Sequence, residues 1–145
     1  MRINEVLSAK SSREVVTVRP DATVRDLLAL LAEHNVGALV VSSDGTSLEG
    51  IVSERDVVRR LHEDESVLDS AVSEIMTSEV HTCEGDHAVI DLMLVMTQKR
   101  IRHVPVLQNG SLSGIISIGD VVKSRMSELE FERDQLNTYV HSAQS

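Results

Sequence analysis

The chain has 145 residues, of which 41% are hydrophobic and 1% aromatic, and this is enough for one ordinary hydrophobic core. Its formal net charge of −9 disfavours binding along a nucleic-acid backbone, and one Phe and one Tyr give no platform for stacking bases. A single cysteine excludes an internal disulfide framework, and neither a signal segment nor a bilayer-spanning apolar run is present, so we expect a cytoplasmic protein without membrane contact.

An internal repeat organises the sequence. Residues 15–45 match residues 80–110 at a constant offset, and after a one-residue gap the match continues through GIVSERDVV at 50–58 and GIISIGDVV at 114–122. Self-similarity over this length predicts two copies of one structural unit.

The first copy changes its hydrophobic periodicity from strand to helix and back. EVVTV at 14–18 is β-branched and predicts a strand, whereas ATVRDLLALLAEH at 22–34 has apolar residues at helical spacing. Apolar runs at 38–42 and 48–53 flank SDGT, whose Asp-Gly pair is typical of a hairpin turn. DVVRRL at 56–61 then predicts a second helix.

The second copy repeats this order, with strands or helices expected at 80–83, 88–99, 103–107, 112–117 and from Gly119 onward. Pro105 lies inside the third of these segments. Since proline has no backbone N–H, we expect its nitrogen to face a sheet edge or a ligand.

Each copy is thus a β-α-β-β-α unit, too small to bury its own apolar face well. We predict an α/β (α+β) fold in which the two units pack with pseudo-two-fold symmetry and a C-terminal amphipathic helix follows. INEVLS at the start of the chain parallels VSEIMT before the second copy, with four extra residues in the loop after the first. The predicted boundaries are unit one at 1–62, an acidic linker at 63–71, unit two at 72–125 and a helical extension at 126–145.

The extension has a heptad-like apolar stripe that Arg133 interrupts, formed by Val122, Met126, Leu129, Leu136 and Val140. Such a stripe needs a partner. A helix folded back on its own domain would satisfy it, but we favour contact with a second copy in a homodimer.

Both strand-to-helix junctions have the pattern Ser-x-x-Asp, as Ser53 with Asp56 and as Ser117 with Asp120. One interpretation is structural, because the pattern resembles a capping box that satisfies free N–H groups at a helix start. The other is functional, because a short carboxylate can accept both hydroxyl protons of a ribose. Duplication copies structural features too, so both interpretations stay open.

A basic cluster in the second copy has no counterpart in the first. Arg102 and His103 lie where a helix ends and a strand begins, and Arg matches phosphate oxygens bidentately. Gly37 and Ala38 occupy the equivalent positions of the first copy. Arg55 compensates in part, although a cation there is also compatible with a solvated surface.

Other kinds of site are not expected. The histidines show no metal-binding spacing, and Cys83 without a CxxC partner is expected to be a small buried hydrophobe. Dinucleotide, P-loop and nucleophile-elbow patterns are missing from the sequence. An acid–base pair of Asp120 and His103 in a small hydrolase or transferase is the enzymatic alternative, and we expect no enzyme.

The doubled Gly-apolar-apolar-Ser-x-x-Asp pattern, the segment IRHVPV and the V-x-T entry strands together resemble the cystathionine-β-synthase (CBS) domain family. The resemblance covers residues 1–125 and is closest to a tandem CBS pair without a fused enzyme. It implies a disc-like dimer and an adenosine ligand between the repeats, with AMP first and ATP, ADP, NAD(H) or S-adenosylmethionine as alternatives.

The resemblance also implies roles for particular residues. Asp56 and Asp120 would contact ribose, with Ser53 and Ser117 as polar support. Ile118 would line the adenosine pocket, Thr17 and Thr82 would edge the entry strands, and Arg102 with His103 would meet the phosphate. The remaining neighbours of the cleft would be Gly37, Ala38, Arg55 and Pro105. Because the cations belong to the second copy, we expect the stronger site at Asp120.

The expected function is a regulatory adenine-nucleotide sensor that shifts its arrangement when ligand binds and signals to an unidentified protein effector. A structural dimerisation adaptor with vestigial sites is the main alternative. We expect no nucleic-acid partner.

Overall fold

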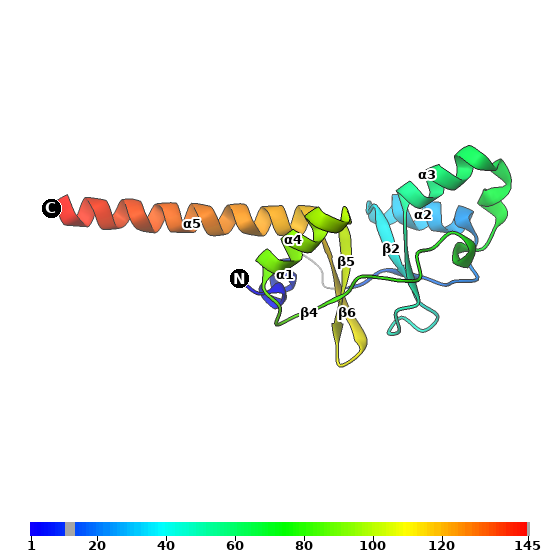
Figure 1. Cartoon of the computed structure of the whole chain (residues 1–145), viewed down its shortest axis with the longest axis horizontal. Coiled ribbons are helices and arrows are strands. Elements are labelled where there is room, and N and C mark those ends of the chain that lie inside the picture. The colour runs from blue at the N-terminus through cyan, green and yellow to red at the C-terminus, as the bar shows by residue number, and fades with distance from the viewer. Residues whose placement is uncertain (11–13, 145) are drawn as a thin grey trace.

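The computed structural model describes residues 1–10 and 14–144. Residues 11–13 of the predicted first unit and the last residue of the predicted extension lie outside the described residues. The described chain forms two three-stranded sheets flanked by helices, with a long helix that leaves the body (Figure 1). This confirms the predicted α/β fold with two related units and a C-terminal helix.

The first repeat follows the predicted order, with β1 (Thr17–Val18), α2 (Val24–His34), β2 (Ala38–Val41), β3 (Gly50–Ser53) and α3 (Glu54–Glu63). β2 lies in the middle of the sheet, parallel to β1 and antiparallel to β3. The predicted hairpin turn is present: Asp44 Oδ1 accepts hydrogen bonds from the N–H groups of Thr46 and Ser47 at 2.9 and 2.8 Å, and Gly45 has φ +83°.

The second repeat is built alike, with β4 (Cys83–Glu84), α4 (Val89–Lys99), β5 (His103–Gln108), β6 (Ser111–Ser117) and α5 (Ile118–Gln144). β5 is central, parallel to β4 and antiparallel to β6. Pro105 is buried in β5 opposite Ile115, one residue before the stretch that pairs with β4. Cys83 is buried, as expected.

Three short helices lie outside the predicted elements, namely α1 (Ile3–Ala9), η1 (Glu65–Asp69) and η2 (Val72–Glu74). Each is too short to give a clear helical periodicity in the sequence. The stretch predicted as an acidic linker therefore contains a 3-10 helix, and its Val67 is buried in the core of the first repeat.

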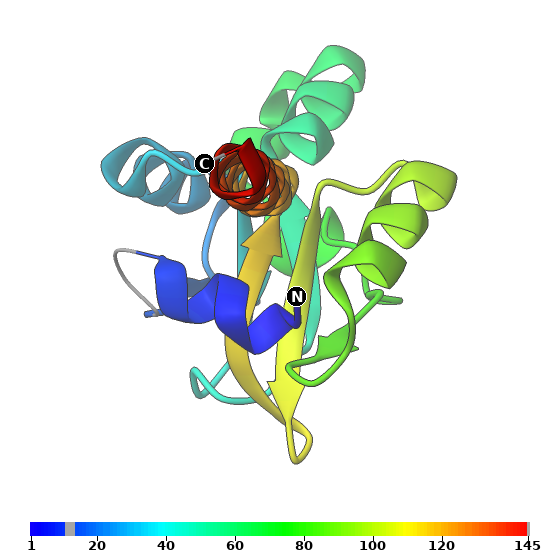
Figure 2. The same cartoon turned by 90° about the vertical axis from the view of Figure 1, so that its left-hand side faces the viewer.

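Two of these short helices, α1 and η2, cross between the repeats. Ile3, Val6 and Leu7 of α1 are buried in the core of the second repeat, whereas Val72 and Ile75 are buried in the core of the first. Helix α1 contacts β6 and α5, which are far from it in the sequence, and Figure 2 shows it (blue) lying across β6. The segment before each copy thus completes the core of the other copy.

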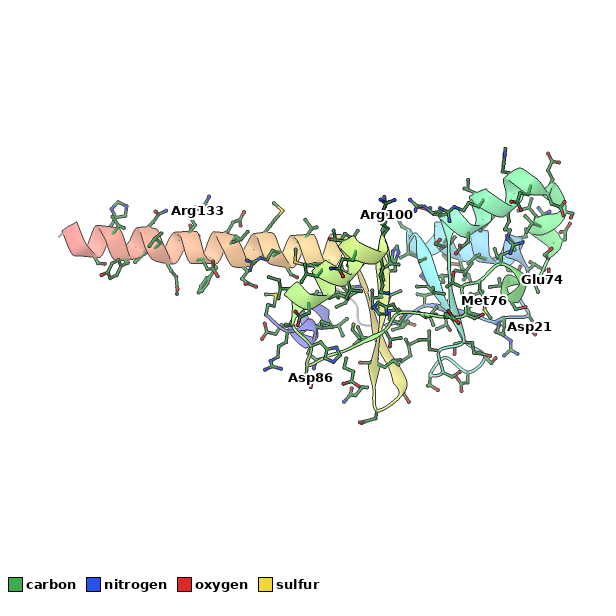
Figure 3. All side chains as sticks on the ribbon, viewed as in Figure 1. Asp21, Glu74, Met76, Asp86, Arg100 and Arg133 are labelled. Carbon is green, nitrogen blue, oxygen red and sulfur yellow. The ribbon has the colours of Figure 1, made fainter. Side chains whose placement is uncertain are left out.

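A glycine permits each crossing. A Cβ on Gly50 would lie 2.7 Å from Met76 Sδ and 2.8 Å from the Thr77 carbonyl oxygen, and one on Gly114 would lie 2.8 Å from Leu7 Cδ2. Any side chain at either position would collide with the segment that packs on the strand. Met76 lies against the first repeat in Figure 3.

Helix α5 runs far beyond both sheets, on the side away from α2 and α3 (Figure 1), and Figure 2 shows its axis end-on. The predicted stripe is exposed along this helix, from 42% exposure at Val140 to 63% at Leu136. The helix does not fold back on its own domain. Over residues 1–10 and 14–144, no helix combines the length and apolar character that crossing a bilayer requires.

Candidate functional site

A cleft of about 960 Å³ opens between the repeats, and we call it the inter-repeat cleft. The β3–α3 junction of the first repeat forms one side, and the end of α4 with the start of β5 forms the other. The chain between the repeats, residues 77 and 79–81, lines it as well. In Figure 3 Arg100 marks the end of α4 that faces the first repeat.

Asp56 enters this cleft from the first turn of α3. Its Oδ2 atom accepts hydrogen bonds from Ser53 N at 2.8 Å and Ser53 Oγ at 3.1 Å, and Ser53 Oγ accepts one from Asp56 N at 3.3 Å. This is a capping box, so the structural interpretation of the pattern is confirmed. Within residues 1–10 and 14–144, no hydrogen bond reaches Asp56 Oδ1, which leaves that oxygen for another donor.

Capping alone does not distinguish Asp56. Thr23 and Asp26 form the same box at the start of α2, with Asp26 N at 3.1 Å from Thr23 Oγ1 and Thr23 N at 3.3 Å from Asp26 Oδ2. Asp26 is exposed and does not line the inter-repeat cleft. The distinguishing feature of Asp56 is therefore its position in the cleft.

Cations of the second repeat line the same cleft as Asp56. Arg102 is joined there by Lys99 and Arg100 at the end of α4, and α3 adds Arg55 and Arg59. Against these five cations stand three carboxylates, those of Glu54, Asp56 and Glu79. In a chain of net charge −9, this is a local excess of positive charge that favours an anion.

This grouping differs from the expected one. The sequence predicts Arg102 and His103 beside Asp120, because all three belong to the second copy. In the structure both line the cleft with Asp56, since this cleft joins the helix start of one repeat to the strand start of the other, while His103 also lies opposite Ser117 in the sheet and near the carboxylate of Asp120.

His103 occupies the boundary between the two repeats. A Cβ on Gly37 would lie 3.6 Å from His103 Cε1, so the small residue makes room for the imidazole. Burial lowers the pKa of His103, although the carboxylates of Asp120 and Glu54 oppose this effect. His103 is therefore mainly neutral at pH 7, which leaves the arginines and Lys99 as the positive charges of the cleft.

The second junction repeats the capping box but has a different neighbour. Asp120 Oδ2 accepts a hydrogen bond from Ser117 N at 2.9 Å, and Ser117 Oγ accepts one from Asp120 N at 3.1 Å. Lys10 Nζ lies 2.9 Å from the same Oδ2 atom. Burial raises the pKa of Asp120, but the bonds from Ser117 and Lys10 outweigh it, so the pKa falls below the ordinary value.

The structure places the other expected residues as follows. Gly37 and Ala38 line the inter-repeat cleft beside Asp56. Thr17 lies in β1 and Thr82 precedes β4, and neither lines the cleft. Ile118 instead lines a shallower groove of about 460 Å³ along the first turns of α5.

Four cations that the structure places at the two junctions are not among the residues predicted from the sequence. Lys99 and Arg100 belong to the same basic run as Arg102, and this run is the signal that could have found them. Arg59 lies one helical turn after Arg55, a spacing that indicates a shared face. Lys10 had no sequence signal, because its partner is 110 residues away.

Glu84, Asp86 and His87 form an exposed group whose ligand atoms lie within 4.8 Å of one another. Asp86 is labelled in Figure 3, away from the cleft. Exposed carboxylates next to a histidine are common without a metal, so this group does not define a metal site.

Comparison with known proteins agrees with this architecture. The CBS domain family model matches residues 4–63 and 72–127, which together cover most of the chain. The chain therefore belongs to the CBS-domain family and is a CBS-domain pair.

Individual relatives have the same organisation. The mitochondrial CBS domain-containing protein CBSX3 of Arabidopsis thaliana is 39% identical over 125 residues, which are 83% of this chain and 61% of that protein. A putative signal-transduction protein with CBS domains from Burkholderia ambifaria is 42% identical, with a TM-score of 0.82 over 88% of this chain and 95% of that one. The CBS domain pair of protein MJ0100, solved with 5-methylthioadenosine and S-adenosyl-L-methionine, has a TM-score of 0.75 over 85% of this chain and 98% of that one, at 22% identity.

Proposed function

We propose that the inter-repeat cleft binds an adenosine ligand with a phosphate group, with AMP as the first candidate, and that the protein is a regulatory module rather than an enzyme. The observation that supports this most directly is the meeting of Asp56 with the cations of the other repeat in one cleft. A carboxylate suits a ribose diol, and a cluster of arginines suits a phosphate.

In this proposal Asp56 Oδ1 accepts the ribose hydroxyls, and the phosphate meets Arg102 with Lys99 or Arg100. His103, which is mainly neutral, contributes a hydrogen bond rather than a charge. A ligand with a phosphate is favoured over S-adenosylmethionine, because the excess positive charge in the cleft repels the sulfonium group.

The proposed signalling follows from the position of the cleft. A ligand that contacts both repeats stabilises the arrangement in which Asp56 and Arg102 lie at the right separation. A partner that recognises this arrangement would respond to the ligand, so the effector is proposed to be a protein rather than a nucleic acid.

Replacing Asp56 tests the ribose assignment. We expect Asp56→Ala to weaken AMP binding at least about tenfold, because a charge-assisted hydrogen bond contributes roughly 1.5–3 kcal/mol. Isothermal titration calorimetry of the full chain measures the change. Asp26→Ala is the matched control, since it removes the same type of capping box outside the cleft and should bind AMP like the parent. Equal binding by the Asp56 and Asp26 variants would contradict the proposal.

We further propose that α5 joins two copies of the chain. Its exposed apolar stripe, which only Arg133 interrupts, has the spacing of a helix-to-helix contact. Light scattering should give a mass of roughly twice 15.9 kDa for the full chain. Leu136→Lys should shift the protein toward the monomer, whereas Gln135→Lys, on the neighbouring helix position, should not. A monomeric parent chain would exclude this arrangement.

A further inference from the structure

Lys10 occupies the second Ser-x-x-Asp junction. Its Nζ atom lies 2.9 Å from Asp120 Oδ2 and donates a second hydrogen bond, also of 2.9 Å, to the carbonyl oxygen of Ile115. The side chains of Lys10 and Asp120 are only 26% and 23% exposed, so the ion pair is largely shielded from water. Such shielding strengthens the pair relative to one on an open surface.

Among residues 1–10 and 14–144, no side chain has this role in the first repeat. There the residue equivalent to Ile115 is Ile51, which exchanges two backbone hydrogen bonds with Thr77, of 2.8 and 2.9 Å. The connection from INEVLS to the first repeat is four residues longer than the connection from VSEIMT to the second repeat. With this longer connection, the carbonyl oxygen of Ile115 accepts a hydrogen bond from the Lys10 ammonium instead of a backbone N–H.

We propose that Lys10 is a tethered competitor for the carboxylate of Asp120, so that the repeats provide one open adenosine site at Asp56 and one closed site at Asp120. The inference rests on the proposed role of these carboxylates in ribose binding. It reverses the expectation from the sequence, in which the stronger of the two sites is the one at Asp120.

The competition follows from charge and from hydrogen-bond geometry. A ribose hydroxyl is a neutral donor, whereas the Lys10 ammonium is a charged donor that neutralises the carboxylate. A ribose that donates to both oxygens of Asp120 must displace this ammonium from Oδ2, and one that donates to Oδ1 alone meets a carboxylate whose charge the ammonium already neutralises. The lowered pKa of Asp120 supports the pairing, because the carboxylate remains ionised over the whole neutral range.

Removing the ammonium tests the proposal. Calorimetric titration with AMP should give one molecule per parent chain and two per Lys10→Met chain. We expect the additional site to bind AMP at least about tenfold more tightly than the parent does at Asp120. The double variant Lys10→Met, Asp120→Ala should return to one molecule per chain, and Lys10→Arg, which keeps the cation, should behave as the parent. Circular dichroism checks that each variant is folded.

The outcomes separate this inference from the proposed function. If Asp56→Ala abolishes binding while the parent and Lys10→Met chains both bind one AMP, the competitor role is wrong and the proposed function stands. Two AMP molecules bound by the parent chain would also overturn the competitor role. If Asp56→Ala binds like the parent, the proposed function fails. If the Lys10→Met chain does not fold, the Lys10→Gln variant, which keeps a polar side chain, is titrated with AMP in its place. The same stoichiometry then decides.

Discussion

Leu7→Ala is expected to lower the free energy of unfolding by about 2–5 kcal/mol, the range measured for large-to-small substitutions in well-packed cores. Leu7 is 1% exposed and packs in the core of the second repeat, although it precedes the first repeat in sequence. Chemical denaturation followed by circular dichroism gives the change.

Leu94→Ala is the control, because Leu94 also lies in a helix but is 55% exposed. This substitution should lower the free energy of unfolding by much less than Leu7→Ala does. The location of the destabilisation can be measured as well. The rate of amide hydrogen exchange in the Leu7 variant should rise more in β6 than in β3, because the crossing helix α1 covers the second repeat. A larger rise in β3 would mean that α1 packs on the repeat that follows it.

Gly50→Ala is expected to lower the free energy of unfolding by about 1–3 kcal/mol, as overpacking usually does. The new Cβ would lie 2.8 Å from the backbone oxygen of Thr77, which can move only if the Ile51 to Thr77 hydrogen bonds break. Thermal unfolding monitored by circular dichroism measures the loss.

Gly119→Ala provides the contrast in the second copy of the same pattern. Its Cβ would meet only Ser117 Oγ, at an ordinary 3.7 Å, and it lies in the first turn of α5. Because alanine favours a helix over glycine by about 1 kcal/mol, this variant should be neutral or more stable. A Gly50 variant as stable as the Gly119 variant would show that the crossing segment is not held against the strand.

For the candidate site, the sequence predicted the residue types more reliably than their grouping. Ser53, Asp56, Arg102 and His103 were all selected, because their chemistry and their positions at element boundaries are visible in the sequence. Their assembly into one cleft was not predicted, since it depends on how one repeat faces the other. Lys10 could not be selected at all, because only folding brings it to Asp120.

The electrostatic properties of the site likewise divide into those visible in the sequence and those that depend on folding. The cluster of positive residues around Arg102 is evident from the sequence, and the structure places these residues along the inter-repeat cleft, where anion binding stays a prediction. That His103 is mainly neutral depends on its burial, which lowers its pKa more than the carboxylates of Asp120 and Glu54 raise it, and no sequence pattern reports this balance.

By itself, the sequence determined the repeat, the order of strands and helices in each copy, the pairing of Ser with Asp at both junctions and the exposed stripe of α5. These features are local, because periodicity, turn residues and capping depend on neighbours within a few positions. The tertiary structure decided that α1 and η2 each pack on the repeat that they do not precede, that Asp56 shares a cleft with Arg102, and that Lys10 pairs with Asp120 at the other junction. Each of these depends on contacts between distant segments, which form only when two units that are too small to be stable alone bury their apolar faces together.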